Sequence, residues 1–177
     1  MTELAVALLV GSFTLSAVLT ALAKRLAPRV GLVAHPKADR YHRSIIPLGG
    51  GIAIFATLAT FLLGAAAAIR FLVVPGHLNS LVERTGLNPA DFLQRFHELA
   101  VILLCAAVLF VVGLRDDKRA LGPFVKLIVQ FAVAGTAAYF ADVRIEFFIE
   151  SRIVTAALSA FWIVVIVNAF NFLDNMD

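Results

Sequence analysis

Long apolar stretches alternate with short polar connections along the whole chain. Five of these stretches approach the ~20 apolar residues that a helix needs to cross the hydrocarbon core of a bilayer. They cover residues 4–27, 48–74, 99–114, 124–141 and 153–172. The pattern predicts an all-α, polytopic bundle of transmembrane helices, and residues 1–177 are expected to form a single integral membrane unit.

A shorter helix is predicted in the second polar connection. Asn88 suits an N-cap, Pro89 suits the first helical position and Asp91 suits the first turn. Apolar residues then recur at helical spacing, which indicates a short helix at the membrane interface leading into the third span.

Composition supports the membrane interpretation. Of the 177 residues, 61% are hydrophobic and only 15% are charged, and the mean hydropathy is +0.93. These values exclude an ordinary soluble domain. The first apolar stretch is too long for the core of a signal peptide and has no basic residue before it, so it is predicted to stay as a membrane helix. The chain is therefore expected in the inner (plasma) membrane, in contact with the lipid bilayer.

The basic residues gather in alternate connections. In the second and fourth connections nearby Asp and Glu match or outnumber the basic residues, whereas in the first and third connections the basic residues outnumber them. By the positive-inside rule the first and third connections are cytoplasmic and the N-terminus is outside, so the C-terminal stretch is cytoplasmic too. The cations on the cytoplasmic side are Lys24, Arg25, Arg29, Lys37, Arg40 and Arg43, followed by Arg115, Lys118, Arg119 and Lys126.

The first of three polar clusters on this face is "HPKADRYHRSIIPLGGG", residues 35–51. It joins basic and His side chains, among them His42 and Arg43, to three glycines at the start of the second span. The exposed N–H groups and the dipole of such a helix start favour an anion such as phosphate. A topogenic loop whose glycines serve helix packing is the alternative.

The second cluster is "GLRDDKRALGPFVK", residues 113–126. Asp116 and Asp117 repel each other unless a cation is near, and a divalent metal would relieve that repulsion. A solvated loop balanced by neighbouring cations is the alternative. Lys126 argues against it, because a lysine about one turn inside an apolar helix needs to snorkel or to bind an anion.

The third cluster is "NAFNFLDNMD", residues 168–177. Its polar residues cannot all share one helical face, because successive residues lie ~100° apart around a helix. We expect the helix to end or unwind near Asp174, with the asparagines inside the bundle and the aspartates at its mouth. Polar groups at this depth are costly and by default mark a functional site, although Asn can also hydrogen-bond a neighbouring helix. Together the three clusters suit Mg²⁺ with phosphates.

The three clusters resemble the polyprenyl-phosphate N-acetylhexosamine-1-phosphate transferases, which form glycosyltransferase family 4. The resemblance lies in "YHRSIIPLGGG", "GLRDDKRALGPFVKLIVQ" and "NAFNFLDNMD", in this order, and is closer to the undecaprenyl-phosphate N-acetylglucosamine-type members than to the muramoyl-pentapeptide enzyme. It implies that a polyprenyl phosphate attacks a UDP-N-acetylhexosamine to give polyprenyl-diphospho-sugar and UMP, with Mg²⁺ or alternatively Mn²⁺ as cofactor. Such a reaction initiates lipopolysaccharide, teichoic acid or peptidoglycan lipid-intermediate synthesis.

The resemblance also implies roles for single residues. Asp116 and Asp117 match the catalytic aspartate pair, and Asp117 and Asp174 match metal ligands. The implied partners are polyprenyl phosphate and the UDP-sugar; no nucleic acid is expected, and a homodimer is left open. The implied substrate-binding residues are Lys126, Asn168, Asn171, Asp177, His42 and Arg43.

The chain also departs from the family. Family members have more helices, a further metal-binding Asp and a His-containing motif, so this chain resembles an N-terminal portion that we expect to be inactive alone. A membrane transporter with a cytoplasmic polar or ion site is the alternative function. It would not require a basic, Gly-rich loop and an aspartate pair on the same face.

Overall fold

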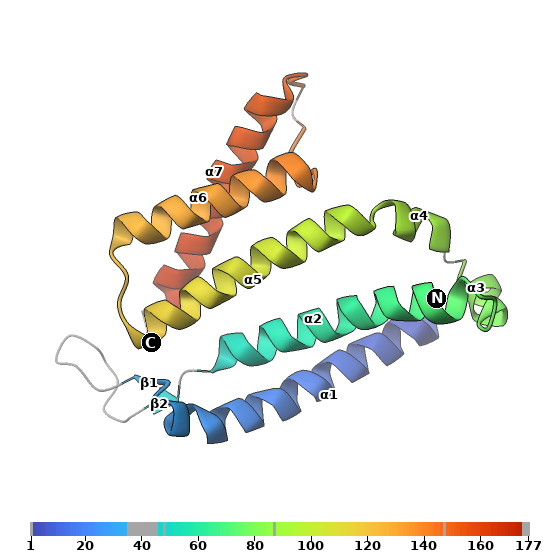
Figure 1. Cartoon of the computed structure of the whole chain (residues 1–177), viewed down its shortest axis with the longest axis horizontal. Helices are drawn as coiled ribbons and strands as arrows, with labels where there is room; N and C mark the ends of the chain where they lie inside the picture. The colour runs from blue at the N-terminus through green and yellow to red at the C-terminus, as the bar shows by residue number, and fades with distance from the viewer. Residues whose placement is uncertain (1, 35–45, 48, 87, 147, 175–177) are drawn as a thin grey trace. The chain divides into compact units, whose positions relative to one another are not determined.

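The computed structural model describes residues 2–34, 46–47, 49–86, 88–146 and 148–174 (Figure 1). Helices make up most of this part of the chain, as predicted. It divides into two compact units, Met1–Val30 with Gly49–Phe96 and Gly31–Leu48 with His97–Asp177. The single membrane unit predicted for residues 1–177 stays a prediction.

Within the described residues, five helical segments are long and apolar enough to cross a membrane, which confirms the predicted multi-pass architecture. The third, α5 (Phe96–Lys118), is longer than the apolar stretch 99–114 that predicted it. The helix continues through Asp116 and Asp117, so the aspartate pair lies on a last helical turn and not in a solvated loop. The five segments are Thr2–Val30, Gly50–Val73, Phe96–Lys118, Pro123–Phe140 and Arg152–Leu173.

In the first unit, α1 (Thr2–Leu26) and α2 (Gly50–Ala68) run antiparallel beside each other (Figure 1). α1 passes into the 3₁₀ turn Ala27–Val30, and α2 into the π-helical turn Ile69–Val73. A Cβ on Gly49 would lie 3.2 Å from the Cβ of Ala23, so a glycine allows the close approach of the two helices at this point. Gly49 is the N-cap of α2, and the predicted Gly-rich helix start is confirmed.

Two short helices complete the first unit. α4 (Pro89–Gln94) confirms the predicted short helix, and the side chain of its N-cap, Asn88, accepts a hydrogen bond from Ala90 N at 3.2 Å. α3 (Asn79–Thr85) was not predicted from the sequence. It ends on Gly86 with φ 64°, a left-handed conformation that glycine adopts without steric cost.

The second unit contains α5, α6 (Pro123–Phe140), α7 (Arg152–Asp174) and a short antiparallel ladder. In the ladder β1 (Val33–Ala34) pairs with β2 (Ile46–Pro47), which the sequence did not predict. α6 and α7 lie against each other (Figure 1), with small buried residues at their contact. Small side chains let membrane helices approach closely. The contact residues include Ala134, Ala138, Ala156, Ala160 and Val164.

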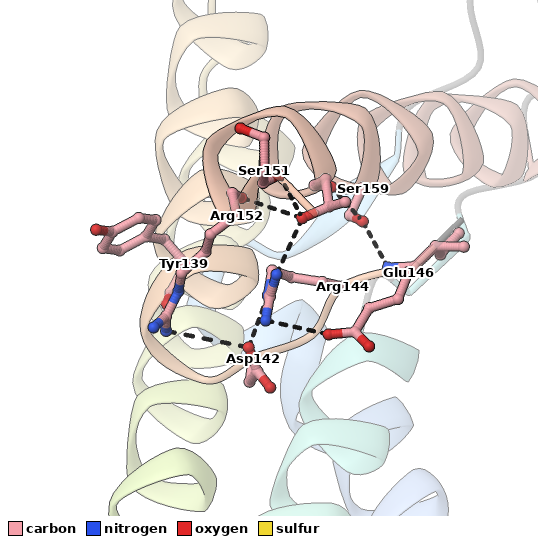
Figure 2. Close-up of polar contacts among 9 residues, drawn as sticks. Tyr139, Asp142, Arg144, Glu146, Ser151, Arg152 and Ser159 are labelled. Atoms are coloured by element: carbon pink, nitrogen blue, oxygen red, sulfur yellow. Dashed lines mark hydrogen bonds and ion pairs between the residues drawn. The ribbon is translucent and has the colours of Figure 1, made fainter. Parts of the chain in front are cut away.

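One arginine organises the connection between α6 and α7 (Figure 2). The Arg144 guanidinium donates to Asp142 Oδ1 at 2.6 Å, to Glu146 Oε1 at 3.2 Å and to Thr155 Oγ1 at 3.0 Å. Its side chain is only 12% exposed, and Thr155 is buried. Ser159 Oγ accepts from Ile145 N at 2.8 Å. We call this group of contacts, which joins the connection to the first turns of α7, the α6–α7 clasp.

A second arginine closes the clasp from α7 (Figure 2). Arg152 donates to Tyr139 O at 2.7 Å, and its guanidinium carbon lies 4.9 Å from the centre of the Tyr139 ring. The contact combines a charge-assisted hydrogen bond with a cation–π interaction. Because Tyr139 is in the last turn of α6 and Arg152 begins α7, the contact fixes where the chain leaves one helix and enters the other.

Replacing Arg144 with Met should destabilise the protein by about 2 kcal/mol, because charged hydrogen bonds are lost and the buried Thr155 hydroxyl loses its donor. Denaturant titration in detergent micelles measures the free energy of unfolding. Arg84→Met is the matched control, since Arg84 is exposed and lies in α3. An equal change in both variants would contradict the role given to the clasp.

A polar strip across three helices

An ion pair joins the end of α5 to the start of α6. Lys126 Nζ lies 2.5 Å from Asp116 Oδ2, and Leu121 N donates to Asp116 Oδ1 at 2.7 Å. Both side chains are partly buried, with 31% of Lys126 and 25% of Asp116 exposed. An ammonium in the first turn of a helix is opposed by the helix dipole, and the Asp116 carboxylate offsets that cost. Asp116 therefore positions Lys126.

Asp117 is set apart from this ion pair. It follows Asp116 on the same helix, so its side chain leaves α5 about 100° further around the axis. Asp117 is exposed, whereas Asp116 is partly buried. The predicted aspartate pair is therefore split: Asp116 faces Lys126, and Asp117 is turned toward a different side of the helix.

A hydrogen bond between α6 and α7 continues the polar line. Asn168 Nδ2 donates to Gln130 Oε1 at 2.7 Å and to Val164 O at 2.8 Å. Both N–H groups of the Asn168 amide are engaged in this way, which fixes the orientation of its carbonyl oxygen. The NH₂ group of Gln130 and the carbonyl oxygen of Asn168 are thus held in place beside each other. A preorganised donor and acceptor of this kind suit a polar ligand.

Gln130 was not predicted as a site residue. It lies four residues after Lys126 on α6, and this spacing places both on one helical face. The sequence did contain a usable signal, because a single Gln inside an apolar helix is as unusual at membrane depth as Asn168. We define the polar strip as Asp116, Lys126, Gln130 and Asn168.

The other predicted site residues have different outcomes. Asn171 is exposed, against the expectation that it lies inside the bundle. Asp174 is the last residue of α7, and its side chain is outside the described part. His42, Arg43 and Asp177 also lie outside the described residues, as does the predicted unwinding after Asp174.

The donor chemistry near the strip is compatible with a magnesium ion. The described residues contain no cluster of three or more His, Cys, Asp or Glu side chains that could hold a metal. Mg²⁺ rarely needs such a cage, because it commonly binds one or two carboxylates together with water and substrate phosphates. Asp117 offers a carboxylate of this kind on the exposed last turn of α5.

Comparison with known proteins shows which family this part of the chain is similar to. Residues 99–177, which include the whole polar strip, match the model of glycosyl transferase family 4. This part of the chain is similar to that family. The predicted resemblance to this family is therefore confirmed, and the match begins within α5 and covers α6 and α7.

Several curated proteins are similar in sequence to much of this chain. A Bacillus subtilis protein named "Probable undecaprenyl-phosphate N-acetylglucosaminyl 1-phosphate transferase" is 26% identical, over 100% of this chain and 44% of its own length. A Mycobacterium tuberculosis decaprenyl-phosphate N-acetylglucosaminephosphotransferase is 28% identical, over 87% of this chain and 36% of its own length. A Salmonella typhi undecaprenyl-phosphate alpha-N-acetylglucosaminyl 1-phosphate transferase is 27% identical, over 71% of this chain and 27% of its own length. The chain thus spans less than half of the length of these relatives. No solved structure matches it.

The hydrogen bond between Gln130 and Asn168 can be tested by a double-mutant cycle. Gln130→Leu should cost about 1 kcal/mol of stability, because Asn168 loses its interhelical partner within the membrane. In the Gln130→Leu background, Asn168→Leu should lower the free energy of unfolding by less than it does in the unmodified protein. Removing both polar groups leaves neither of them unpaired. Denaturant titration of the two single variants and the double variant gives the coupling energy. Strict additivity would contradict the bond.

Proposed function

We propose that the protein containing this chain transfers a sugar 1-phosphate from a UDP-N-acetylhexosamine to a polyprenyl phosphate, releasing UMP. The observation that carries the proposal is the placement of Lys126 by Asp116 on the same helical face as Gln130. A lysine held at a helix N-terminus is suited to phosphate oxygens. The names of the relatives support this substrate class.

In the proposed reaction an oxygen of the lipid phosphate bonds to the phosphorus that carries the sugar. The bond from that phosphorus to the oxygen of the UMP phosphate breaks, and the electron pair leaves with UMP. Lys126 binds non-bridging phosphate oxygens and offsets charge that increases in the transition state. Asp116 keeps the ammonium in place throughout. Gln130 and Asn168 supply a donor and an acceptor for a polar group of the substrate.

The proposed cofactor is Mg²⁺, with Mn²⁺ as the alternative. Asp117 would bind it together with substrate phosphate oxygens, and Asp174 is the second candidate ligand. Such an ion would supply positive charge to the diphosphate. The exposed position of Asp117 on the last turn of α5 supports this role.

Charge distribution supports a cytoplasmic location for the site. The connections rich in Lys and Arg are the first and third, and the polar strip starts at the third, where α5 meets α6. By the positive-inside rule these connections are expected in the cytoplasm and the N-terminus outside. The transporter alternative has no support among the relatives, whose names all describe transferases.

Lys126→Met and Asp117→Asn should each lower UMP release by about a hundredfold or more, because charge that stabilises the transition state is lost. The assay uses membranes that contain the natural protein in its longest form, of which residues 1–177 are a part. Undecaprenyl phosphate and a panel of UDP-sugars are supplied as substrates. Asp91→Asn, an exposed carboxylate of α4, is the control and should retain full activity. Undiminished turnover in Asp117→Asn would refute its assigned role.

Chelation of divalent metal should abolish the same activity, and added Mg²⁺ should restore it, because the diphosphate needs a cation. In parallel, the 177-residue chain alone should release no UMP, since it spans less than half of the length of its relatives. Turnover that persists in excess chelator would contradict the metal proposal. Turnover by the isolated chain would contradict the need for further segments.

A further inference from the structure

A second feature of α5 lies away from the polar strip. Exposed apolar side chains recur along one face of the helix and end at a group of cations. These residues are spaced by three or four positions, so they form a continuous stripe along the helix. The apolar part of the stripe is Leu104, Val108 and Val111, all exposed, and the cationic part is Arg115, Lys118 and Arg119.

The stripe ends in a surface hollow. A cavity of about 450 Å³ is lined by Val111, Leu114, Arg115, Lys118 and Arg119. Its walls are thus apolar on the side of the helix centre and cationic on the side of the helix end. None of the three cations forms an ion pair with a carboxylate of the described residues.

The dimensions of the stripe match one leaflet of a bilayer. From Leu104 to Arg115 a helix rises about 16 Å, and half of the hydrocarbon core is about 15 Å thick. If Leu104 lies near the bilayer centre, Arg115 and its neighbours lie at the depth of lipid phosphates. The positive-inside rule accounts for cations at this end of α5, but it does not require them to align with an exposed apolar stripe.

The stripe lies on a different side of α5 from Asp117. Asp117 lies two residues after Arg115 and therefore about 160° around the helix from it. Asp116 pairs with Lys126 on α6, whereas the cations that line the hollow are Arg115 and Lys118 of α5 and Arg119, which follows α5 directly. A phosphate held in the hollow would thus be separate from one held at Lys126.

We propose that the hollow at the end of α5 binds the headgroup of an anionic phospholipid of the surrounding bilayer. The phosphate contacts Arg115, Lys118 and Arg119, and one acyl chain lies along Val111, Val108 and Leu104. Charge complementarity and the apolar stripe below the cations favour a lipid over a soluble anion, which would gain nothing from the stripe. The bound lipid is a resident of the bilayer and not the substrate of the transferase.

The test measures lipid binding to the purified 177-residue chain by native mass spectrometry, with palmitoyl-oleoyl phosphatidylglycerol and phosphatidylcholine as probes. The chain should prefer phosphatidylglycerol. The triple variant R115Q/K118Q/R119Q should bind it at least about tenfold more weakly, because each cation near an anionic headgroup contributes to binding. The control R70Q/R84Q/R95Q removes the same charge from exposed positions of the first unit and should change binding less than twofold.

Further binding measurements distinguish a bilayer phospholipid from other possible ligands of the hollow. Leu104→Asn with Val111→Asn should also weaken phosphatidylglycerol binding, whereas inorganic phosphate should not compete. Displacement of phosphatidylglycerol by equimolar undecaprenyl phosphate would overturn the proposal, because the face would then bind the substrate lipid. Equal weakening in the two triple variants, or no preference over phosphatidylcholine, would overturn it as well. A longer natural form of the protein that loses the preference would show that a protein segment covers the hollow instead.

Discussion

The register between α6 and α7 is the constraint on which the candidate site depends. The bilayer provides little hydrophobic drive for helices to associate, so packing and interhelical hydrogen bonds must set their alignment. The α6–α7 clasp does so around the connection, through Arg144 and Thr155, and the bond from Asn168 to Gln130 does so near the other ends of the two helices. Small buried residues such as Ala134 and Ala160 fill the contact between them. A change of register by one residue would turn Asn168 away from Gln130.

The ion pair between Asp116 and Lys126 extends this order to α5. Two carboxylates that are adjacent in the sequence invite the interpretation of a single acidic site. On a helix, adjacency separates side chains by about 100°, and the structure gives the two residues different surroundings. Asp116 holds a lysine that the helix dipole disfavours, while Asp117 lies on the exposed side of the same turn. A positioned cation and an exposed carboxylate are the two kinds of group that phosphates and a metal require.

The sequence was informative where local properties decide the structure. Apolar length predicted five membrane helices, and Asn88 with Pro89 predicted the start of α4. Features that depend on distant partners were missed. Arg144 meets Thr155 across 11 residues and Asn168 meets Gln130 across 38, and no local pattern specifies such pairings. The predicted burial of Asn171 was wrong because helical position was inferred from the identity of the residue, and the helix turns this side chain to the surface.

The length of α5 connects the proposed site and the proposed lipid surface. Apolar residues predict a helix that stops at Leu114, but the helix continues to Lys118. This extra turn displays the charged residues on fixed sides of one axis: cations above the apolar stripe, Asp116 toward Lys126, and Asp117 on a third side. In an irregular loop the same charges would pair with each other and be screened by solvent. Helical continuation past the apolar segment is therefore what allows five consecutive charged residues to keep separate roles.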